Sequence, residues 1–234
     1  MASPLALPLD EVHVWRVPLD APPDVLRFCR AALSPDERER AARFKVPGLE
    51  DRFTLARGAL RDVLARYLGI APAEVAFRYA ARGKPFLDVT WLRFNLSHSN
   101  TRALVAVARD RDLGVDIERI EPSRATGGIA QRFFAPAEVG ALMRLPEDQR
   151  VHGFFNCWSR KESYIKALGE GLYAGLDAFE VSLDSPACLL ATRVPGDRAD
   201  RWDLRGLEME AGYTAAVCVE GDDWKLREFD YKPL

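Results

Sequence analysis

The sequence predicts an α+β protein of two pseudo-symmetric halves, each with helices packed on a small, mostly antiparallel sheet. Stretches with helical spacing of apolar residues precede stretches with strand spacing, and this order occurs twice along the 234 residues. The ends of the two long helices are also alike, since Tyr67-Leu68-Gly69 and Ala167-Leu168-Gly169 each precede an Ala-Phe pair. We therefore predict one half over residues 1–112 and another over 113–234, with a ligand in the cleft between them.

Two helices are expected early in the first half. Ser34-Pro35-Asp36-Glu37 has the pattern of a helix start, with an N-cap, a proline at the first helical position and a capping box. A longer helix over 50–68 has apolar residues every three or four positions, ends at Gly69 and carries Arg57 and Arg61 on one face. Alternating apolar residues then predict strands over 75–79, 92–96, 104–108 and 113–117.

The second half repeats this plan. Helical spacing predicts helices over 124–133, 136–145 and 149–168. Alternating or continuous apolar residues predict strands over 179–183, 190–194, 213–219 and 225–229. The duplicated order is the basis for the two-half architecture.

Composition excludes several classes of protein. The 33 basic and 35 acidic residues leave a formal net charge of −2, so we expect no nucleic-acid-binding surface. The longest apolar runs fall far short of the roughly 20 residues of a membrane span, and no basic start precedes an apolar block at the N-terminus. The four cysteines are scattered without a metal or disulfide pattern, which favours a reducing compartment. We expect a cytoplasmic protein without nucleic-acid or membrane partners.

Two carboxylates mark a candidate metal site. Asp116 and Glu118 flank Ile117 in an expected strand, so both side chains lie on one face with backbones roughly 6 to 7 Å apart. Two carboxylates at this separation can supply oxygen ligands to one Mg²⁺. The alternative interpretation is a solvated face of an antiparallel strand.

Glu162 is a third candidate because a carboxylate lies where an apolar residue is expected. About 100° of rotation per residue places it beside Trp158, within the apolar stripe of the helix over 149–168. A carboxylate on a buried face needs a cation nearby. Lys166, four residues later, is one candidate cation, and a metal ion is the other.

Two further segments carry polar groups that suit phosphate oxygens. Asn95-Leu96-Ser97-His98-Ser99 follows a strand and combines amide, hydroxyl and imidazole groups, although a plain polar loop is the alternative. Gly83-Lys84-Pro85 is either an ordinary turn or an anion contact. The sequence has no nucleophile elbow, HExxH motif or nucleotide-binding glycine loop. Phosphate chemistry with a bound metal is the class that remains.

These residues resemble a known family. Gly114-Val115-Asp116-Ile117-Glu118, followed by the segment from Trp158 to Ala167, looks like the paired signature of the 4′-phosphopantetheinyl transferases. The resemblance is to the larger, monomeric subfamily that activates surfactin synthetase, and it extends to four other segments: Arg52 to Gly69, Gly83 to Pro85, Asn95 to Ser99, and Phe133 to Glu138.

The resemblance implies a monomeric enzyme of two pseudo-symmetric halves with its active site in the cleft between them. It implies transfer of the 4′-phosphopantetheine group of coenzyme A to a serine of an apo carrier protein of fatty acid, polyketide or nonribosomal peptide synthesis, with release of adenosine 3′,5′-bisphosphate. Mg²⁺, or Mn²⁺ in its place, is the implied cofactor. The first half would contact coenzyme A, and the second would hold the metal and the catalytic residues.

Roles for individual residues also follow from the resemblance. Asp116, Glu118 and Glu162 would bind the metal ion. Asp116 and Glu162 would also be catalytic, with Lys166 assisting at the reacting phosphate or orienting the base, and Glu138 matches a family glutamate near the site.

Seven residues would contact coenzyme A: Arg52, Arg57, Lys84, Pro85, Ser97, His98 and Lys161. Arg57 and Lys84, with Arg52, would hold its 3′-phosphate and adenine end. His98 and Lys161 would contact its pyrophosphate.

Two other functions use the same residues. A Mg²⁺-dependent phosphoesterase or nucleotidyltransferase would need the same three carboxylates but would turn over a nucleotide alone. A non-catalytic module that binds coenzyme A or holo-carrier proteins would have no chemistry for a carboxylate substitution to abolish.

Overall fold

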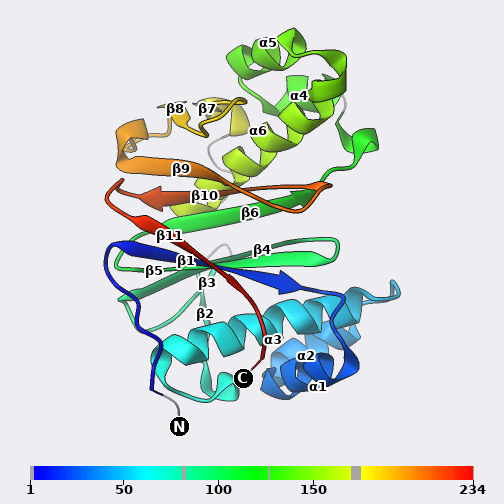
Figure 1. Ribbon diagram of the computed structural model, residues 1–234, viewed down its shortest axis with the longest axis vertical. Helices are drawn as coiled ribbons and strands as arrows, with labels where there is room; N and C mark the ends of the chain where they lie inside the picture. The colour runs from blue at the N-terminus through cyan, green and yellow to red at the C-terminus, as the bar shows by residue number, and fades with distance from the viewer. Residues whose placement is uncertain (1–2, 81–82, 126, 170–174, 234) are drawn as a thin grey trace.

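Figure 1 shows the computed structural model, which describes residues 3–80, 83–125, 127–169 and 175–233. Two sheets form the middle of the molecule, with α1–α3 below them in this view and α4–α6 above. Three buried apolar clusters fill the spaces between these layers, one on each helix side and one between the sheets. The α+β class and its two-half plan are therefore confirmed.

The first half is built around a four-stranded sheet, with helices packed against it. The sheet has the order β11-β1-β5-β4 and consists of β1 (Glu11–Pro18), β4 (Leu92–Ser99), β5 (Arg102–Arg109) and β11 (Lys225–Asp230). The helices are α1 (Pro23–Ala32), α2 (Pro35–Ala42) and α3 (Leu49–Leu68). A 3₁₀ turn, η1 (Pro72–Glu74), and a hairpin of β2 (Arg78–Tyr79) and β3 (Pro85–Phe86) connect α3 to β4.

The second half has a sheet of order β6-β10-β9, formed by β6 (Leu113–Arg119), β9 (Trp202–Leu207) and β10 (Tyr213–Glu220). Its helices are α4 (Gly127–Phe133), α5 (Pro136–Arg144) and α6 (Glu147–Leu168). The strands β7 (Phe179–Val181) and β8 (Leu189–Thr192) form a separate hairpin, and three 3₁₀ turns complete this half: η2 (Pro122–Arg124), η3 (Leu176–Ala178) and η4 (Ala199–Arg201). The order β6-β10-β9 matches β1-β5-β4 of the first half.

Local sequence explains the helix boundaries. The predicted capping box is present at the start of α2, where the Ser34 backbone N–H donates to the Glu37 carboxylate at 3.0 Å. Both long helices end at a glycine with positive φ, Gly69 and Gly169, the conformation that stops a helix without strain on a side chain.

Some predicted elements differ in the structure. The strand expected over 75–79 is present only at Arg78–Tyr79, because η1 precedes it. The helix expected over 124–133 begins at Gly127. Among the described helices and strands, β1, α1, β3 and β9 had no prediction. The described residues contain no helix long and apolar enough to cross a membrane.

The last strand joins the two parts of the chain. β11 pairs in parallel with β1, from Glu11 opposite Lys225 to Arg16 opposite Asp230. In Figure 1 this red strand lies beside the blue N-terminal strand. A division at residues 112/113 stays a prediction, and β11 is the segment that crosses it.

One glycine brings α6 close to β6. A Cβ atom on Gly114 would lie 2.1 Å from the Ser163 carbonyl oxygen and 2.3 Å from the Ala167 backbone nitrogen, so no side chain fits there. This close approach places the residues of α6 next to the residues that follow Gly114 in β6.

Candidate active site

The carboxylates predicted from strand spacing do share one face of β6. The intersheet apolar cluster contains Val115 and Ile117, so the alternate residues Asp116 and Glu118 project to the other face, toward α6. The side chain of Asp116 is nearly inaccessible, with 3% of the residue exposed, whereas Glu118 is partly exposed.

Lys166 of α6 reaches the same place. Its Nζ donates to Asp116 Oδ1 at 2.6 Å and to Ser97 Oγ at 2.9 Å. Glu162 lies one turn earlier on α6, and within the described residues its carboxylate has no hydrogen bond or ion pair. The structure therefore brings together Asp116, Glu118, Glu162 and Lys166, as predicted, from one strand and one helix.

Mutual repulsion and burial disfavour ionisation of these acids. Burial, with the neighbouring Asp116 and Glu118 carboxylates, raises the pKa of Glu162 to about 7, against the opposing effect of the Lys166 ammonium. Burial and the Asp116 carboxylate also raise the pKa of Glu118. The Lys166 ammonium bonds to Asp116 and the Arg124 guanidinium acts on Glu118, whereas Glu162 has no ion pair among the described residues, which favours binding of a further cation.

The polar segment at the end of β4 supports these acids. Ser97 Oγ donates to Asp116 Oδ1 at 2.8 Å, and Ser99 Oγ donates to Glu118 Oε2 at 3.0 Å. The coenzyme A contact expected for Ser97 stays a prediction, and in this structure its hydroxyl bonds to Asp116 and Lys166. The spacing of the serines relative to the carboxylates was not recognised in the sequence, although alternate positions 97 and 99 match 116 and 118.

His98 projects to the opposite face of β4 and lines a cavity of about 580 Å³ in the first half. Arg52 and Arg57, both expected to contact coenzyme A, line the same cavity. Desolvation by surrounding protein and the Lys166 ammonium lower the pKa of His98. The cavity and the acid cluster thus lie on the two faces of one strand.

The cavity residues that the sequence analysis did not predict include one arginine and three aromatic residues: Arg40, Phe44, Phe53 and Tyr79. Arg40 lies one turn after Glu37 on α2, which was a usable signal for a residue on the same helix face. Tyr79 comes from a two-residue strand, and no local pattern of the sequence places it beside α3.

Arg57 is held in a fixed orientation at the cavity wall. Its guanidinium donates to the Glu37 carboxylate and, at 2.6 Å, to the Tyr79 hydroxyl, and lies 4.1 Å from the centroid of the Phe77 ring. Arg61 shares Glu37 as an acceptor at 2.6 Å but donates its remaining hydrogen bonds to backbone carbonyls. Of the two arginines on one face of α3, Arg57 lines the cavity.

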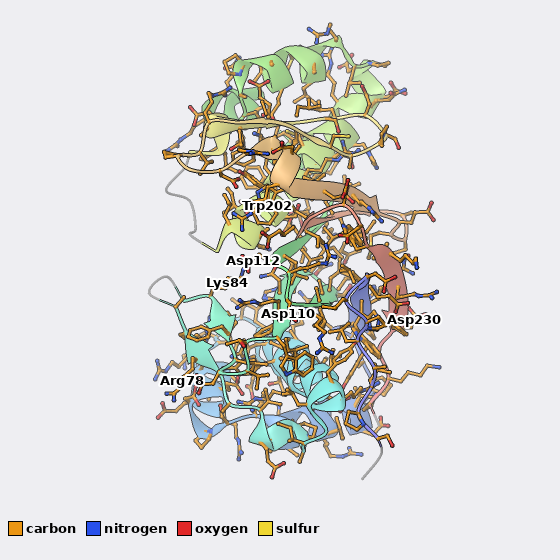
Figure 2. All side chains as sticks on the ribbon, turned by 90° about the vertical axis from the view of Figure 1, so that its left-hand side faces the viewer. Arg78, Lys84, Asp110, Asp112, Trp202 and Asp230 are labelled. Atoms are coloured by element: carbon orange, nitrogen blue, oxygen red, sulfur yellow. The ribbon has the colours of Figure 1, made fainter. Side chains whose placement is uncertain are left out.

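Lys84 does not lie beside Arg57, with which it was expected to hold the 3′-phosphate of coenzyme A. Its Nζ donates to the Lys166 carbonyl oxygen at the C-terminal end of α6, and burial lowers its pKa. Lys84 and Pro85 line a separate cavity of about 180 Å³ together with Asp112, and Figure 2 shows Lys84 beside Asp112 where the halves meet. The structure therefore does not bring Lys84 and Arg57 to one phosphate-binding site.

Lys161 and Glu138 form a buried ion pair away from the acid cluster. Lys161 is 0% exposed, its Nζ lies 2.7 Å from Glu138 Oε2, and it donates to the carbonyl oxygens of Leu176 and Phe179. Glu138 also accepts the backbone N–H groups at the start of α5 and at Val181 in β7. These contacts use the hydrogen-bonding groups of both residues within the protein, whereas the pyrophosphate contact expected for Lys161 and the catalytic role expected for Glu138 stay predictions.

The acid cluster fits the chemistry of a divalent cation. Among the described residues, no group of three or more His, Cys, Asp or Glu side chains has already converged to hold a metal. However, Asp116 Oδ2 is buried without a hydrogen-bond partner, and the neighbouring acids are carboxylates, the ligands that Mg²⁺ prefers. An unpaired buried oxygen facing other carboxylates is a feature that a bound cation would satisfy.

The fold and the site together define an enzyme of phosphate-group transfer, with an acid cluster beside a basic and aromatic cavity. Comparison with known proteins identifies the family. Residues 112–218 match the model of the 4′-phosphopantetheinyl transferase superfamily.

The chain is 42% identical to the 4′-phosphopantetheinyl transferase HetI of Nostoc sp., over 97% of this chain and 95% of that protein. It is 31% identical to the 4′-phosphopantetheinyl transferase Sfp of Bacillus subtilis, over 82% of this chain and 84% of that protein. It is 32% identical to the 4′-phosphopantetheinyl transferase gsp of Aneurinibacillus migulanus, with 89% and 85% covered. The chain therefore belongs to the 4′-phosphopantetheinyl transferases, as the sequence motifs predict.

Proposed function

We propose that this chain transfers the 4′-phosphopantetheine group of coenzyme A to a serine of an apo carrier protein and releases adenosine 3′,5′-bisphosphate. Membership of the transferase family supports the reaction class. The observation that carries the assignment to this site is the position of Asp116, Glu162 and Lys166 immediately behind β4, whose other face lines the basic cavity. A diphosphate that extends from the cavity past the end of β4 would meet the acid cluster.

The cavity supplies the groups that a nucleotide end of coenzyme A needs. Arg40, Arg52 and Arg57 offer guanidinium groups to the 3′-phosphate, and His98 lies on the side of the cavity nearest the acids. The rings of Phe44, Phe53 and Tyr79 offer surfaces on which an adenine can stack.

Mg²⁺, or Mn²⁺ in its place, would be held by Asp116, Glu118 and Glu162. When bound, such an ion neutralises charge on the diphosphate and orients it for displacement. Its binding would also satisfy Asp116 Oδ2, the buried oxygen without a partner.

The reaction is an in-line displacement at the β-phosphorus. The serine oxygen forms the new P–O bond, and the bond to the oxygen of adenosine 3′,5′-bisphosphate breaks. The Glu162 carboxylate has no hydrogen-bond partner among the described residues, which leaves an oxygen free to accept a proton, so we assign it the serine proton. Lys166, held by Asp116 and Ser97, places its ammonium beside the negative charge that accumulates.

A single chain supplies both the cavity and the acid cluster, which supports a monomeric enzyme. Cytoplasmic location fits the absence of a disulfide pattern, since all four cysteines are free.

The direct test is incubation of the protein with coenzyme A, Mg²⁺ and a panel of apo carrier proteins, followed by intact-protein mass spectrometry. We expect one carrier or more to gain the mass of one phosphopantetheine, and the gain to disappear with EDTA and return with Mg²⁺ or Mn²⁺. Turnover that survives exhaustive chelation would reject the metal assignment. A carrier panel without any mass gain, with coenzyme A bound, would favour the non-catalytic binding module.

A further inference from the structure

The two sheets meet along a seam in which side chains replace strand pairing. β6 is an edge strand that pairs with β10 on one side only, so the N–H groups on its other side need acceptors. Three of them donate to side chains of β4 that are twenty residues earlier: Val115 N–H to Asn95 Oδ1 at 3.0 Å, Ile117 N–H to Ser97 Oγ at 3.3 Å, and Arg119 N–H to Ser99 Oγ at 3.0 Å. We call Asn95, Ser97 and Ser99 the seam residues.

The alternation of β4 explains why these positions are polar. Phe94 and Leu96 pack against the first-half core, and His98 on the same face lines the cavity. The seam residues project to the opposite face, toward the second sheet. Each replaces the backbone carbonyl that an adjacent strand would have offered to β6.

The hydroxyl of Ser97 has no capacity for another ligand. It donates its one hydrogen to Asp116 Oδ1 and accepts from both the Ile117 N–H and the Lys166 ammonium, which fills both lone pairs. The residue is also only 5% exposed. A phosphate oxygen would need a donor, and Ser97 has none left to give.

We propose that Ser97 and Ser99 are positioning residues for the transfer reaction, and that they act by fixing the acid cluster to the seam between the halves. Ser97 sets the place of Asp116 and Lys166, and Ser99 sets the place of Glu118. This proposal rests on the proposed function of the same site. Because His98 belongs to the same strand, the seam also fixes the distance from the cavity to the acids, so a substrate held in one is in register with the other.

If the serines position the acids, their substitution should lower kcat and leave the KM for coenzyme A unchanged. Ser97→Ala should lower kcat by roughly 30-fold or more, because Asp116 and Lys166 lose a shared partner, while KM and the calorimetric Kd for coenzyme A stay within about twofold. Ser99→Ala removes a less buried partner and should lower kcat by about fivefold, again with KM unchanged. Ser99→Ala also serves as the second variant if Ser97→Ala does not fold.

Two neighbouring positions serve as matched controls. Asn95→Ala breaks the seam at a residue that touches no carboxylate, so it should lower Tm as much as Ser97→Ala but reduce kcat by less than about threefold. His98→Ala changes the other face of the strand and should raise the KM for coenzyme A.

Three results would overturn the proposal. A rise in KM and Kd for coenzyme A in Ser97→Ala would make Ser97 a substrate contact. Equal kcat losses in Asn95→Ala and Ser97→Ala would reduce the serine to a structural role. An unchanged kcat in both serine variants would remove any role in catalysis. Failure of the wild-type protein to modify any carrier would instead reject the function itself, so the two failures are distinguishable.

Discussion

The two halves share a plan but differ in how closely the long helix approaches its sheet. In the second half, Gly114 lets the backbone of α6 lie against β6. In the first half, aromatic side chains separate α3 from β1, where Trp15 Nε1 donates to the Tyr67 hydroxyl at 2.9 Å. The glycine contact of α3 is made with another helix, because a Cβ on Gly58 would lie 2.4 Å from Cys29 Cβ.

This difference determines the ion-pair partners of acidic and basic residues at equivalent positions of the two long helices. Asp62 and Arg66 occupy α3 as Glu162 and Lys166 occupy α6, each pair ending one turn before the terminal glycine. Arg66 pairs with Asp62 itself at 2.6 Å and lies over the Trp15 ring, which completes a structural ion pair. Lys166 reaches across to the strand instead and leaves Glu162 without a partner in the described structure. Close approach of helix and strand thus replaces an ion pair within the helix by one between helix and strand.

The largest effect should come from closing the space at Gly114. In Gly114→Val the new Cβ would overlap the backbone of α6 at Ser163 and Ala167, so the helix must move away from β6. We expect transfer activity to fall by more than about 100-fold, since small displacements of catalytic groups have effects of this size. Activity by carrier mass spectrometry and helix content by circular dichroism test this.

Gly140→Ala is the matched control for that substitution. Its Cβ would meet nothing closer than Arg144 Nη1 at 3.4 Å, and alanine in a helix is favoured over glycine by about 0.5–1 kcal/mol. A Gly114→Val protein with full activity would show that the site does not depend on close packing of α6.

Removal of the buried lysine should affect stability rather than substrate binding. Lys161→Met leaves Glu138 without its ammonium partner, and breaking a buried pair costs about 3–5 kcal/mol. At roughly 2–4 °C per kcal/mol for a protein of this size, Tm should fall by about 10 °C. The folded fraction should keep its KM for coenzyme A.

Lys45→Met, at an exposed lysine, controls for the general loss of a positive charge. If Lys161→Met raised the KM for coenzyme A about tenfold with Tm unchanged, the pyrophosphate contact expected from the sequence would be restored.

Equivalent acids in the two helices should respond in opposite ways. Glu162→Gln removes the assigned proton acceptor and should lower kcat by roughly 100-fold without any loss of Tm. Asp62→Asn breaks the structural pair of α3 and should lower Tm while the folded enzyme keeps its kcat. Steady-state kinetics and thermal unfolding of both variants give the comparison, and near-normal kcat in Glu162→Gln would make that residue structural as well.

The smallest effect is a pH dependence of stability. The pKa of Glu162 is about 7 in the folded protein against an ordinary value of 4.5, so the folded state holds the proton more tightly. Its contribution to stability is therefore present below pH 4.5 and is lost as pH rises to 7. In EDTA, Glu162→Gln should raise Tm above the wild type at pH 8, and this difference should vanish near pH 4.5.

Addition of Mg²⁺ at pH 8 provides the matching control. It should raise the Tm of the wild type by more than that of Glu162→Gln, because the cation offsets the carboxylate charge. An equal Tm for the two proteins in EDTA at every pH would contradict the raised pKa.

Most of the fold could be predicted from local patterns. The elements that were not predicted lack such patterns or depend on contacts distant in sequence. Glycine stops and the Ser34 capping box defined the long helices and α2 because these signals depend on a few adjacent residues. β1 and α1 lacked such recognised signals, and the parallel pairing of β11 with β1 depends on residues more than two hundred positions apart. No local pattern contains that information.

The sequence by itself identified the three candidate acidic residues and the protein family. Strand period placed Asp116 and Glu118 on one face, and helical period placed Glu162 on a stripe that needed a cation, because side-chain direction follows from backbone geometry. Only the tertiary structure decided which acid each lysine of this helix pairs with, and among the described residues neither lysine pairs with Glu162. Lys161 and Lys166 lie on the same helix, yet one is buried against Glu138 and the other meets Asp116. The physical reason is that the partner of a charge depends on which element packs against each face of the helix, and packing is set by contacts distant in sequence.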